Sequence, residues 1–238
     1  MQRITPLERD DVTADADPAG AAGPRTAAKC AVEAIGTFFL VFTCDAAVSS
    51  GTPLAPLAIG AVLMVMVYAG GHISGGHYNP AVTLAVLVRQ RISLRDAARY
   101  WGVQLGAALV AAAVVHWVVD PAHTGTPATL TVPTGRLVAV FVVEFLFTFA
   151  LCYVVLNVAT SGKRSDNSYY GLAIGFTVVS GAFAVGAISG GAFNPSVTVG
   201  AAVAGLFAWP TLWIYLVAQA IAAVAAGLTY VGLNPDEK

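Results

Sequence analysis

Residues 72–83 are His-Ile-Ser-Gly-Gly-His-Tyr-Asn-Pro-Ala-Val-Thr, and residues 187–198 are Ala-Ile-Ser-Gly-Gly-Ala-Phe-Asn-Pro-Ser-Val-Thr. The second stretch repeats the first, so the chain contains an internal duplication. The Asn-Pro pair in each copy predicts a helix start, because Asn is a favoured N-cap residue and Pro suits the first helical position. Asn79 and Asn194 are therefore expected to cap two related helices, each preceded by the small backbone of Ser-Gly-Gly.

The chain around these motifs has the composition of a membrane protein. Of its 238 residues, 57% are hydrophobic and only 11% are charged, and its mean hydropathy is +0.74. About a quarter of the residues of a soluble protein are charged, so this composition excludes a soluble enzyme. The net charge of −1 offers no basic surface for a nucleic acid.

Charged residues divide the chain into apolar segments of membrane-spanning length. Basic residues gather at 89–99 and at 163–164, and the segment 120–133 carries none. By the positive-inside tendency, both clusters and both chain ends face the cytoplasm, and segment 120–133 faces outward. An even number of crossings must then separate the cytoplasmic points, which six spans satisfy. The predicted spans are residues 29–48, 55–71, 100–119, 137–158, 169–186 and 210–231.

Two apolar segments that begin at the Asn-Pro pairs are too short to span a membrane. Residues 79–88 form a helix of about 15 Å, half of the roughly 30 Å hydrocarbon thickness, and residues 194–205 are of similar length. Both are predicted to be re-entrant half-helices. Because irregular backbone cannot be exposed to lipid, these segments must be buried in protein or line a water-filled path.

The two halves of the chain are expected to insert in opposite orientations. Each half contains three spans, an odd number, and Glu33 of the first span matches Glu144 of the fourth. An inverted repeat of this kind brings its related segments together near the middle of the membrane. The positive N-terminal ends of the half-helices then meet and repel cations and protons. The side-chain amides of Asn79 and Asn194 can donate hydrogen bonds to a passing hydroxyl group.

These features resemble the aquaporin, or major intrinsic protein, family. The resemblance covers about residues 29–231 and rests on Asn79-Pro80-Ala81 and Asn194-Pro195-Ser196, in register with six spans and two matched glutamates. It implies six helices and two half-helices around a pore in each protomer, a homotetramer, and passive transport of water or small uncharged solutes. Ser196 replaces the usual Ala of the motif, a small-for-small change that the family tolerates.

The predicted fold is therefore an all-α membrane protein with an inverted 3+3 repeat. Residues 1–28, rich in Ala, Asp and Pro, are expected to form a disordered cytoplasmic tail. Residues 29–232 form the aquaporin-like channel domain, with repeat 1 at about 29–119 and repeat 2 at about 136–232, and residues 233–238 form a second cytoplasmic tail. We expect a multi-pass protein of the cell membrane with both termini in the cytoplasm.

The chain departs from the family pattern at the constriction. Family members that conduct water or glycerol typically carry Arg three positions after the second Asn, where this chain has Val197. When the family's other three constriction positions are transferred to this chain by their spacing from the two Asn residues, they fall on Ile59, Ala182 and Gly191. None of these side chains is charged, aromatic or a hydrogen-bond donor. We therefore expect a wide, apolar filter that passes glycerol and other polyols, urea or neutral metalloid acids besides water, and excludes ions and protons.

Four polar residues within the predicted membrane segments need an interpretation. The family resemblance makes Glu33 and Glu144 acceptors for backbone N–H groups of the re-entrant segments, and we favour this supporting role over a proton relay. His77 is expected to pack and hydrogen-bond within its loop, with a pH-dependent gate at the cytoplasmic vestibule as the alternative. Asp45, near the outer end of the first span, is expected at the membrane interface.

Other functions fit the sequence less well, although a strict water channel is a close alternative. A secondary active transporter also uses inverted repeats, but it needs a coupling-ion site, and the spans contain few carboxylates. An embedded enzyme lacks a catalytic constellation, and the histidines and three cysteines have no metal or disulfide spacing. The expected partners are water, small uncharged solutes and membrane lipid, with no nucleic acid, metal or cofactor.

Overall fold

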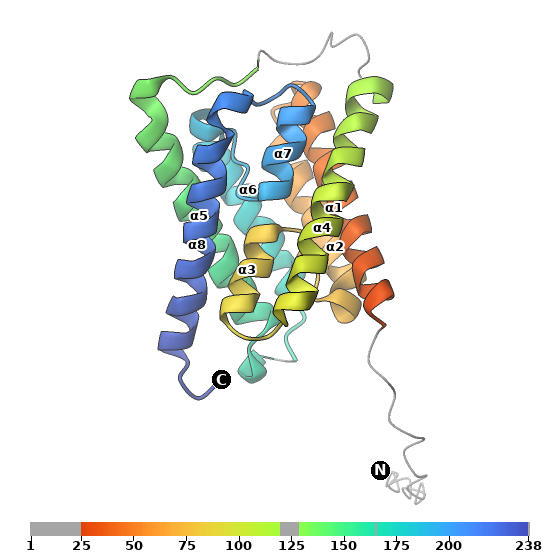
Figure 1. Ribbon diagram of the computed structural model, residues 1–238, viewed down its shortest axis with the longest axis vertical. Helices are drawn as coiled ribbons and strands as arrows, with labels where there is room; N and C mark the ends of the chain where they lie inside the picture. The colour runs from red at the N-terminus through yellow and green to blue at the C-terminus, as the bar shows by residue number, and fades with distance from the viewer. Residues whose placement is uncertain (1–24, 120–128, 165, 238) are drawn as a thin grey trace, which may run out of the picture.

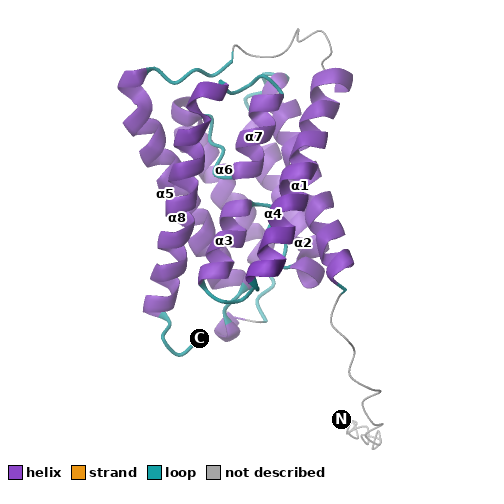
Figure 2. Cartoon of the chain, viewed as in Figure 1, coloured by secondary structure: helices purple, strands orange, loops and turns teal. Residues whose placement is uncertain are grey.

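The computed structural model describes residues 25–119, 129–164 and 166–237, and its regular elements in these ranges are helices (Figures 1 and 2). Six helices are long and apolar enough to cross a membrane. They are α1 (Thr26–Ser49), α2 (Ala55–Ser74), α4 (Leu94–Val114, continued by a π-helical turn at Val115–Val119), α5 (Leu137–Ala159), α6 (Tyr170–Ser189) and α8 (Leu212–Leu233). Two short helices, α3 (Pro80–Val88) and α7 (Pro195–Val203), complete the bundle, and 3-10 turns occupy Thr134–Arg136, Gly162–Arg164 and Trp209–Thr211. The predicted fold of six spans and two half-helices is confirmed.

The two half-helices lie inside the bundle, one in each half of its height. Figure 1 shows α3 in the lower half and α7 in the upper half. The long helices enclose both, since α3 packs against α4, α5 and α8, and α7 packs against α1, α4 and α8. Both described chain ends lie at the lower end in Figure 1. We call this end, which carries Arg91, Gly162 and Glu237, the terminal face, and the other end, which carries Gly51 and Gly205, the opposite face.

The contact between α2 and α6 joins the two repeats through a pair of equivalent glycines. A Cβ atom at Gly60 would lie 2.6 Å from the carbonyl oxygen of Gly175, and one at Gly175 would lie 2.5 Å from that of Gly60. No side chain fits at either position without a backbone shift. Small residues of this kind let two membrane helices approach closely, and here they fix the two repeats against each other.

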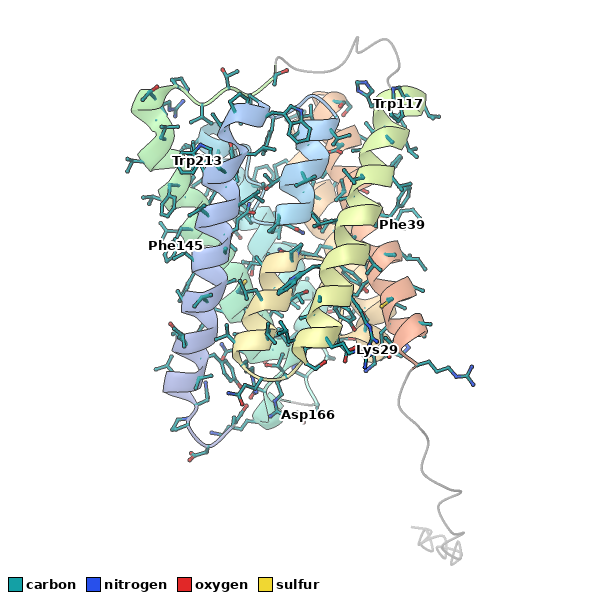
Figure 3. All side chains as sticks on the ribbon, viewed as in Figure 1. Lys29, Phe39, Trp117, Phe145, Asp166 and Trp213 are labelled. Atoms are coloured by element: carbon teal, nitrogen blue, oxygen red, sulfur yellow. The ribbon has the colours of Figure 1, made fainter. Side chains whose placement is uncertain are left out.

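The outer surface of the bundle suits a lipid environment. Trp117 and Trp213 lie toward the upper end and Phe39 lies on the side of the bundle (Figure 3), and their side chains are exposed. The charged residues Lys29 and Asp166 lie at the lower end in the same view. An apolar belt with aromatic residues near its edge is typical of membrane proteins.

The helices extend beyond the predicted spans. α1 begins at Thr26, inside the predicted tail of residues 1–28, and α4 begins at Leu94, six residues before the expected start at 100. Charged residues mark the edge of the hydrocarbon layer, whereas a helix continues to its cap, and Ser93 Oγ caps α4 by accepting from the Asp96 N–H at 3.1 Å. Residues 1–24 and the predicted outward loop at 120–128 lie outside the described residues.

Asp45 is buried, which corrects the expectation of an interfacial position. The residue is 0% exposed, and neither carboxylate oxygen has a hydrogen-bond partner within the described ranges. The carboxylate lies beside Gly200 on α7, since a Cβ atom built on Gly200 would be 3.6 Å from Asp45 Oδ2, an ordinary van der Waals distance. This contact between α1 and α7 is a three-dimensional relation that the sequence does not reveal.

Glu237 binds the C-terminal residues back onto the bundle at the terminal face. Its carboxylate accepts hydrogen bonds from Arg89 Nη2 at 2.9 Å, from Ser161 Oγ at 2.8 Å and from the Tyr230 hydroxyl. Arg89 also donates to the carbonyl oxygen of Thr160 at 2.9 Å. The Arg89 and Glu237 side chains are 1% and 7% exposed. This ion pair therefore joins the end of α3, α8 and the loop after α5.

We expect the contribution of Glu237 to stability to be lost in acid. Hydrogen bonds from Tyr230 and Ser161 lower the pKa of Glu237 from its ordinary value of 4.5 to about 2. Because the pKa is lower in the folded protein than in the unfolded chain, the contribution is complete above about pH 4.5 and declines as the pH falls from there to about 2. Thermal unfolding of the purified protein and of Glu237→Gln, across this pH range, checks the prediction. The two melting temperatures should converge in acid, and a constant difference between them contradicts it.

Candidate pore

The N-terminal ends of α3 and α7 carry the two Asn-Pro motifs to the interior of the bundle. Asn79 Oδ1 caps α3 by accepting from the Ala81 N–H at 2.8 Å, and Asn194 Oδ1 caps α7 by accepting from the Ser196 N–H at 2.9 Å. Proline occupies the beginning of both helices. The local sequence therefore sets both helix starts in the way that the Asn-Pro pair predicts.

Each capping Asn also reaches across to the other repeat. Asn79 Nδ2 donates to the carbonyl oxygen of Phe193 at 3.0 Å, and Asn194 Nδ2 donates to that of Tyr78 at 2.9 Å. A side-chain amide has two N–H donors. One donor of each Asn therefore locks the two loops together, and one remains for a molecule in the pore.

The loops before the half-helices need unusual backbone conformations. Gly75 and Gly190, with φ of 93° and 84°, end α2 and α6 in the left-handed conformation that favours glycine. Tyr78 and Phe193 also have positive φ, 48° and 49°, although neither is glycine. Such strain persists only where the surroundings fix the backbone, and buried hydrogen bonds do so here.

Glu33 supplies these hydrogen bonds in the first repeat. Its Oε1 accepts from Ser74 Oγ at 2.7 Å and from the His77 N–H at 2.9 Å. Its Oε2 accepts from the Tyr78 N–H at 2.7 Å and from Gln104 Nε2 at 2.8 Å. The residue is 0% exposed, so each carboxylate oxygen uses its lone pairs on the loop and on one neighbouring helix.

Glu144 makes the same set of contacts in the second repeat. Its Oε1 accepts from Ser189 Oγ at 2.7 Å and from the Ala192 N–H at 3.0 Å. Its Oε2 accepts from the Phe193 N–H at 2.9 Å and from Gln219 Nε2 at 3.0 Å. With both carboxylates occupied in this way, the arrangement favours a supporting role for the two glutamates over a proton relay.

Sequence reasoning missed two pairs of residues that complete these networks. Gln104 and Gln219 bind the glutamates, while Tyr100 and Tyr215 donate to carbonyl oxygens at the ends of α2 and α6, at 2.7 Å and 2.8 Å. A signal was present, because both pairs have the spacing Tyr-x-x-x-Gln at equivalent places in the two repeats. Extending the repeat search beyond the Asn-Pro motifs would have found them.

A narrow cavity of about 20 Å³ runs beside the two capping Asn residues, and we call it the lumen. On this measure a single water molecule needs about 10–15 Å³, so the lumen suits small molecules in single file. Its wall is mostly aliphatic. It is lined by Leu40, Cys44, Ile59, Leu63, Gly76, His77, Asn79, Val82, Leu151, Val155, Ile174, Val178, Gly191, Ala192, Asn194 and Val197.

The model of the family described as Major intrinsic protein matches residues 20–230 of this chain. The chain belongs to the major intrinsic protein family. Members of this family are channels, so this major intrinsic protein is a multi-pass membrane channel and not an enzyme.

Individual relatives agree with this assignment. The chain is 36% identical over 210 residues to Aquaporin NIP1-1 of Oryza sativa subsp. japonica, covering 85% of this chain and 72% of the relative. It is 40% identical over 207 residues to Glycerol uptake facilitator protein-like 6 of Lactiplantibacillus plantarum, covering 83% and 94%. The X-ray structure of the aquaglyceroporin from Plasmodium falciparum shares the fold, with a TM-score of 0.73, 21% identity, and coverage of 87% and 96%.

Three of the four predicted filter residues of this major intrinsic protein line the lumen, namely Ile59, Gly191 and Val197. Ala182 is not among the lining residues. It lies beside the lumen wall, with its Cα 3.3 Å from the position of a Cβ atom built on Gly191. The α6 side of the wall includes Ile174, two turns before Ala182 on the same helix. Spacing in sequence fixes the face of α6 that points inward, but not the depth at which each residue lies.

His77 stands where the lumen of this major intrinsic protein opens into a vestibule of about 620 Å³ at the terminal face. Charged residues at the vestibule include Lys29 and Arg91. His77 Nδ1 lies 3.0 Å from Thr83 Oγ1, which itself donates to the carbonyl oxygen of Asn79 at 3.1 Å. Because the hydroxyl hydrogen of Thr83 is used in that bond, the Thr83 oxygen accepts from His77. The ring hydrogen of His77 is therefore assigned to Nδ1, which leaves Nε2 as an acceptor. The position suits either the packing role or the gate, and the two remain alternatives.

Proposed function

We propose that this channel passes water and small uncharged solutes passively, such as glycerol or another polyol, urea or a neutral metalloid acid, and excludes ions and protons. The observation that carries the proposal is the junction at Asn79 and Asn194, where two half-helix ends meet beside an aliphatic lumen. The side-chain N–H that each Asn retains can hold a solute oxygen at this point.

Exclusion of cations follows from the electrostatics of the junction. Both half-helices direct the positive ends of their dipoles toward the middle of the channel. The residues that line the lumen, as the structure describes it, include no carboxylate that could compensate this potential. A cation or hydrated proton must also lose water against an aliphatic wall, which costs far more than the desolvation of a neutral molecule.

Two observations support the permeation of solutes larger than water, namely the residues of the constriction and the name of one relative. Val197 cannot form the hydrogen bonds that an Arg would form there, so no polar interaction must break when a solute passes. One relative is named Glycerol uptake facilitator protein-like 6, and the chain covers 94% of that relative's length. In a lumen of about 20 Å³, entry of glycerol requires aliphatic side chains to change rotamer.

A strict water channel is the second candidate, and the small lumen volume favours it. If the side chains of the lumen wall did not change rotamer, the lumen would pass water alone. The two candidates share the junction and the exclusion of ions, and they differ only in the permeability to larger neutral molecules.

The channel is proposed to lie in the cell membrane with its terminal face in the cytoplasm. Lys29, Arg91 and Arg99 lie in or beside the segments of that face, and an excess of basic residues marks the cytoplasmic side of membrane proteins. The proposed partners of the outer surface are membrane lipid and further copies of the chain in a homotetramer.

Proteoliposomes test the proposed function. Stopped-flow light scattering measures their response to water, glycerol and urea gradients, and a pH-sensitive dye inside them reports proton entry. We expect water and glycerol permeability well above that of empty liposomes, without proton entry. Val197→Trp should block the flux, while Val217→Trp, at a position 42% exposed on α8, should not.

The same experiment separates the alternatives. Flux of water alone selects the strict water channel. Solute flux that saturates and follows a proton or sodium gradient selects a secondary active transporter. Proton entry comparable with solute flux contradicts the proposed exclusion mechanism.

A further inference from the structure

Every lumen residue has a counterpart in the other repeat that also lines the lumen. The counterpart lies 111 positions later for α1 and α5, as for Glu33 and Glu144, and 115 positions later elsewhere, as for Asn79 and Asn194. The pairs are Leu40 and Leu151, Cys44 and Val155, Ile59 and Ile174, Leu63 and Val178, Gly76 and Gly191, His77 and Ala192, Asn79 and Asn194, and Val82 and Val197. The lumen therefore consists of two related half-lumens joined at the Asn pair.

The filter residues on the side of the opposite face are repeated, with the same side chains, toward the terminal face. Ile59, Gly191 and Val197 correspond to Ile174, Gly76 and Val82, and all six line the lumen. With Val at position 197, the valine that follows each capping Asn by three residues is the same in both halves.

We propose that permeation is limited at two equivalent apolar constrictions, one on each side of the Asn pair, and that Val82 determines specificity toward the terminal face as Val197 does toward the opposite face. The inference rests on the proposed function, because it concerns the solutes that the same lumen admits. It adds Val82, with Ile174 and Gly76, to the residues that select the solute.

The framework around the two constrictions supports their equivalence. Val82 and Val197 occupy the same position in the first turns of α3 and α7 and are 2% and 4% exposed. The hydrogen bonds from the two Asn side chains to the opposite loops have nearly equal lengths, 3.0 Å and 2.9 Å. Gly60 and Gly175 make reciprocal close approaches beside Ile59 and Ile174. The repeat relation therefore extends to the backbone that carries each constriction.

Three of the lumen pairs differ in residue type, and the pair with the largest difference in polarity is His77 and Ala192. His77 toward the terminal face corresponds to Ala192 on the other side, so the terminal half-lumen has an additional side-chain acceptor at Nε2. A solute that donates hydrogen bonds can be held there after it leaves the Asn pair. The two constrictions share their aliphatic residues and differ in this polar neighbour.

Two barriers in series have a measurable consequence. Their resistances to flux add, so enlarging one of two equal constrictions raises the permeability by at most about twofold, because the other constriction remains. Enlarging both removes this limit, and the double variant should then gain more than the product of the single effects. A single barrier at Val197 gives a different result, since Val197→Ala alone then produces the whole gain.

Glycerol permeability of proteoliposomes that contain Val82→Ala, Val197→Ala or the double variant tests the proposal. Val140→Ala is the matched control, because Val140 is buried, 1% exposed, and is not a lumen residue. Val82→Leu and Val197→Leu narrow the lumen instead, and each should lower glycerol permeability more than water permeability. Protein content and size-exclusion profiles of every variant normalise the flux.

We expect similar modest gains from the two single alanine variants, a larger than multiplicative gain from the double variant, and no gain from Val140→Ala. An effect of Val197→Ala without any effect of Val82→Ala or Val82→Leu overturns the second constriction and leaves the proposed function intact. Unchanged glycerol flux in every variant of a conducting channel does the same. A wild-type channel without flux of water or solute overturns the proposed function, and this inference with it.

Discussion

Glu144→Ala is expected to leave little folded channel in the membrane. The substitution removes the acceptor for four buried donors, namely Ser189 Oγ, the N–H groups of Ala192 and Phe193, and Gln219 Nε2. Each buried donor without a partner costs about 1–3 kcal/mol, so the total loss is comparable with the 5–15 kcal/mol that stabilises a typical protein.

Size-exclusion chromatography after graded heating in detergent measures this loss for Glu144→Ala. Glu33→Ala should behave alike, because Glu33 has the equivalent donors, and Asp166→Ala at an exposed position is the control. Glu144→Gln should be intermediate, since one amide oxygen can still accept two hydrogen bonds while its NH₂ group faces donors. A Glu144→Ala protein that is as stable as wild type and differs only in proton flux contradicts the supporting role and favours the proton relay.

The sequence predicted the parts of the channel that depend on local chemistry and on duplication. The Asn-Pro pairs indicated two helix starts, and the short apolar segments that follow them, residues 79–88 and 194–205, indicated helices too short to span. The count of spans per repeat then required opposite insertion of the halves. Each of these steps uses short-range rules or simple lengths, and the structure confirms the resulting fold.

Features that depend on contacts between distant segments could not be predicted in the same way. The side-chain amide of Asn79 was expected to donate only to a solute, but one of its two N–H groups donates to the carbonyl oxygen of Phe193 in the loop of the other repeat. Asp45 is buried where α1 packs beside Gly200 of α7, a contact between segments far apart in the sequence. The ion pair of Arg89 and Glu237 joins residues at 148 positions' separation, which no periodicity indicates.

The sequence also could not predict how deep each filter residue lies along the channel. Ala182 shares α6 with Ile174 and Val178, yet Ile174 and Val178 line the lumen and Ala182 does not. A helical repeat predicts the face that points inward, whereas the boundary of the lumen depends on where the loops of both repeats fill the bundle. For Ile59, Gly191 and Val197, which all line the lumen, the spacing from Asn79 and Asn194 was sufficient.

Val197→Arg is expected to convert the channel into one that strongly favours water over glycerol. Val197 lines the lumen and is 4% exposed, so a guanidinium group at this position must occupy part of a passage of about 20 Å³. It brings five N–H donors and a permanent positive charge. Water can pass by exchanging hydrogen bonds with these donors, while glycerol must also fit its carbon chain beside them. We expect glycerol permeability to fall by about tenfold or more, which corresponds to about 1.4 kcal/mol in the barrier, and water permeability to fall much less.

Val197→Met is the matched control for Val197→Arg, because methionine is a long, flexible side chain without the charge and the donors. If the polar chemistry of Arg selects for water, the ratio of water to glycerol permeability should rise in Val197→Arg and change little in Val197→Met. Equal loss of both fluxes in the two variants would mean that bulk alone blocks the lumen. An unchanged ratio of water to glycerol permeability in Val197→Arg would place the selective barrier elsewhere. The same ratio would then be measured in Val82→Ala and Val82→Leu, which change the other constriction.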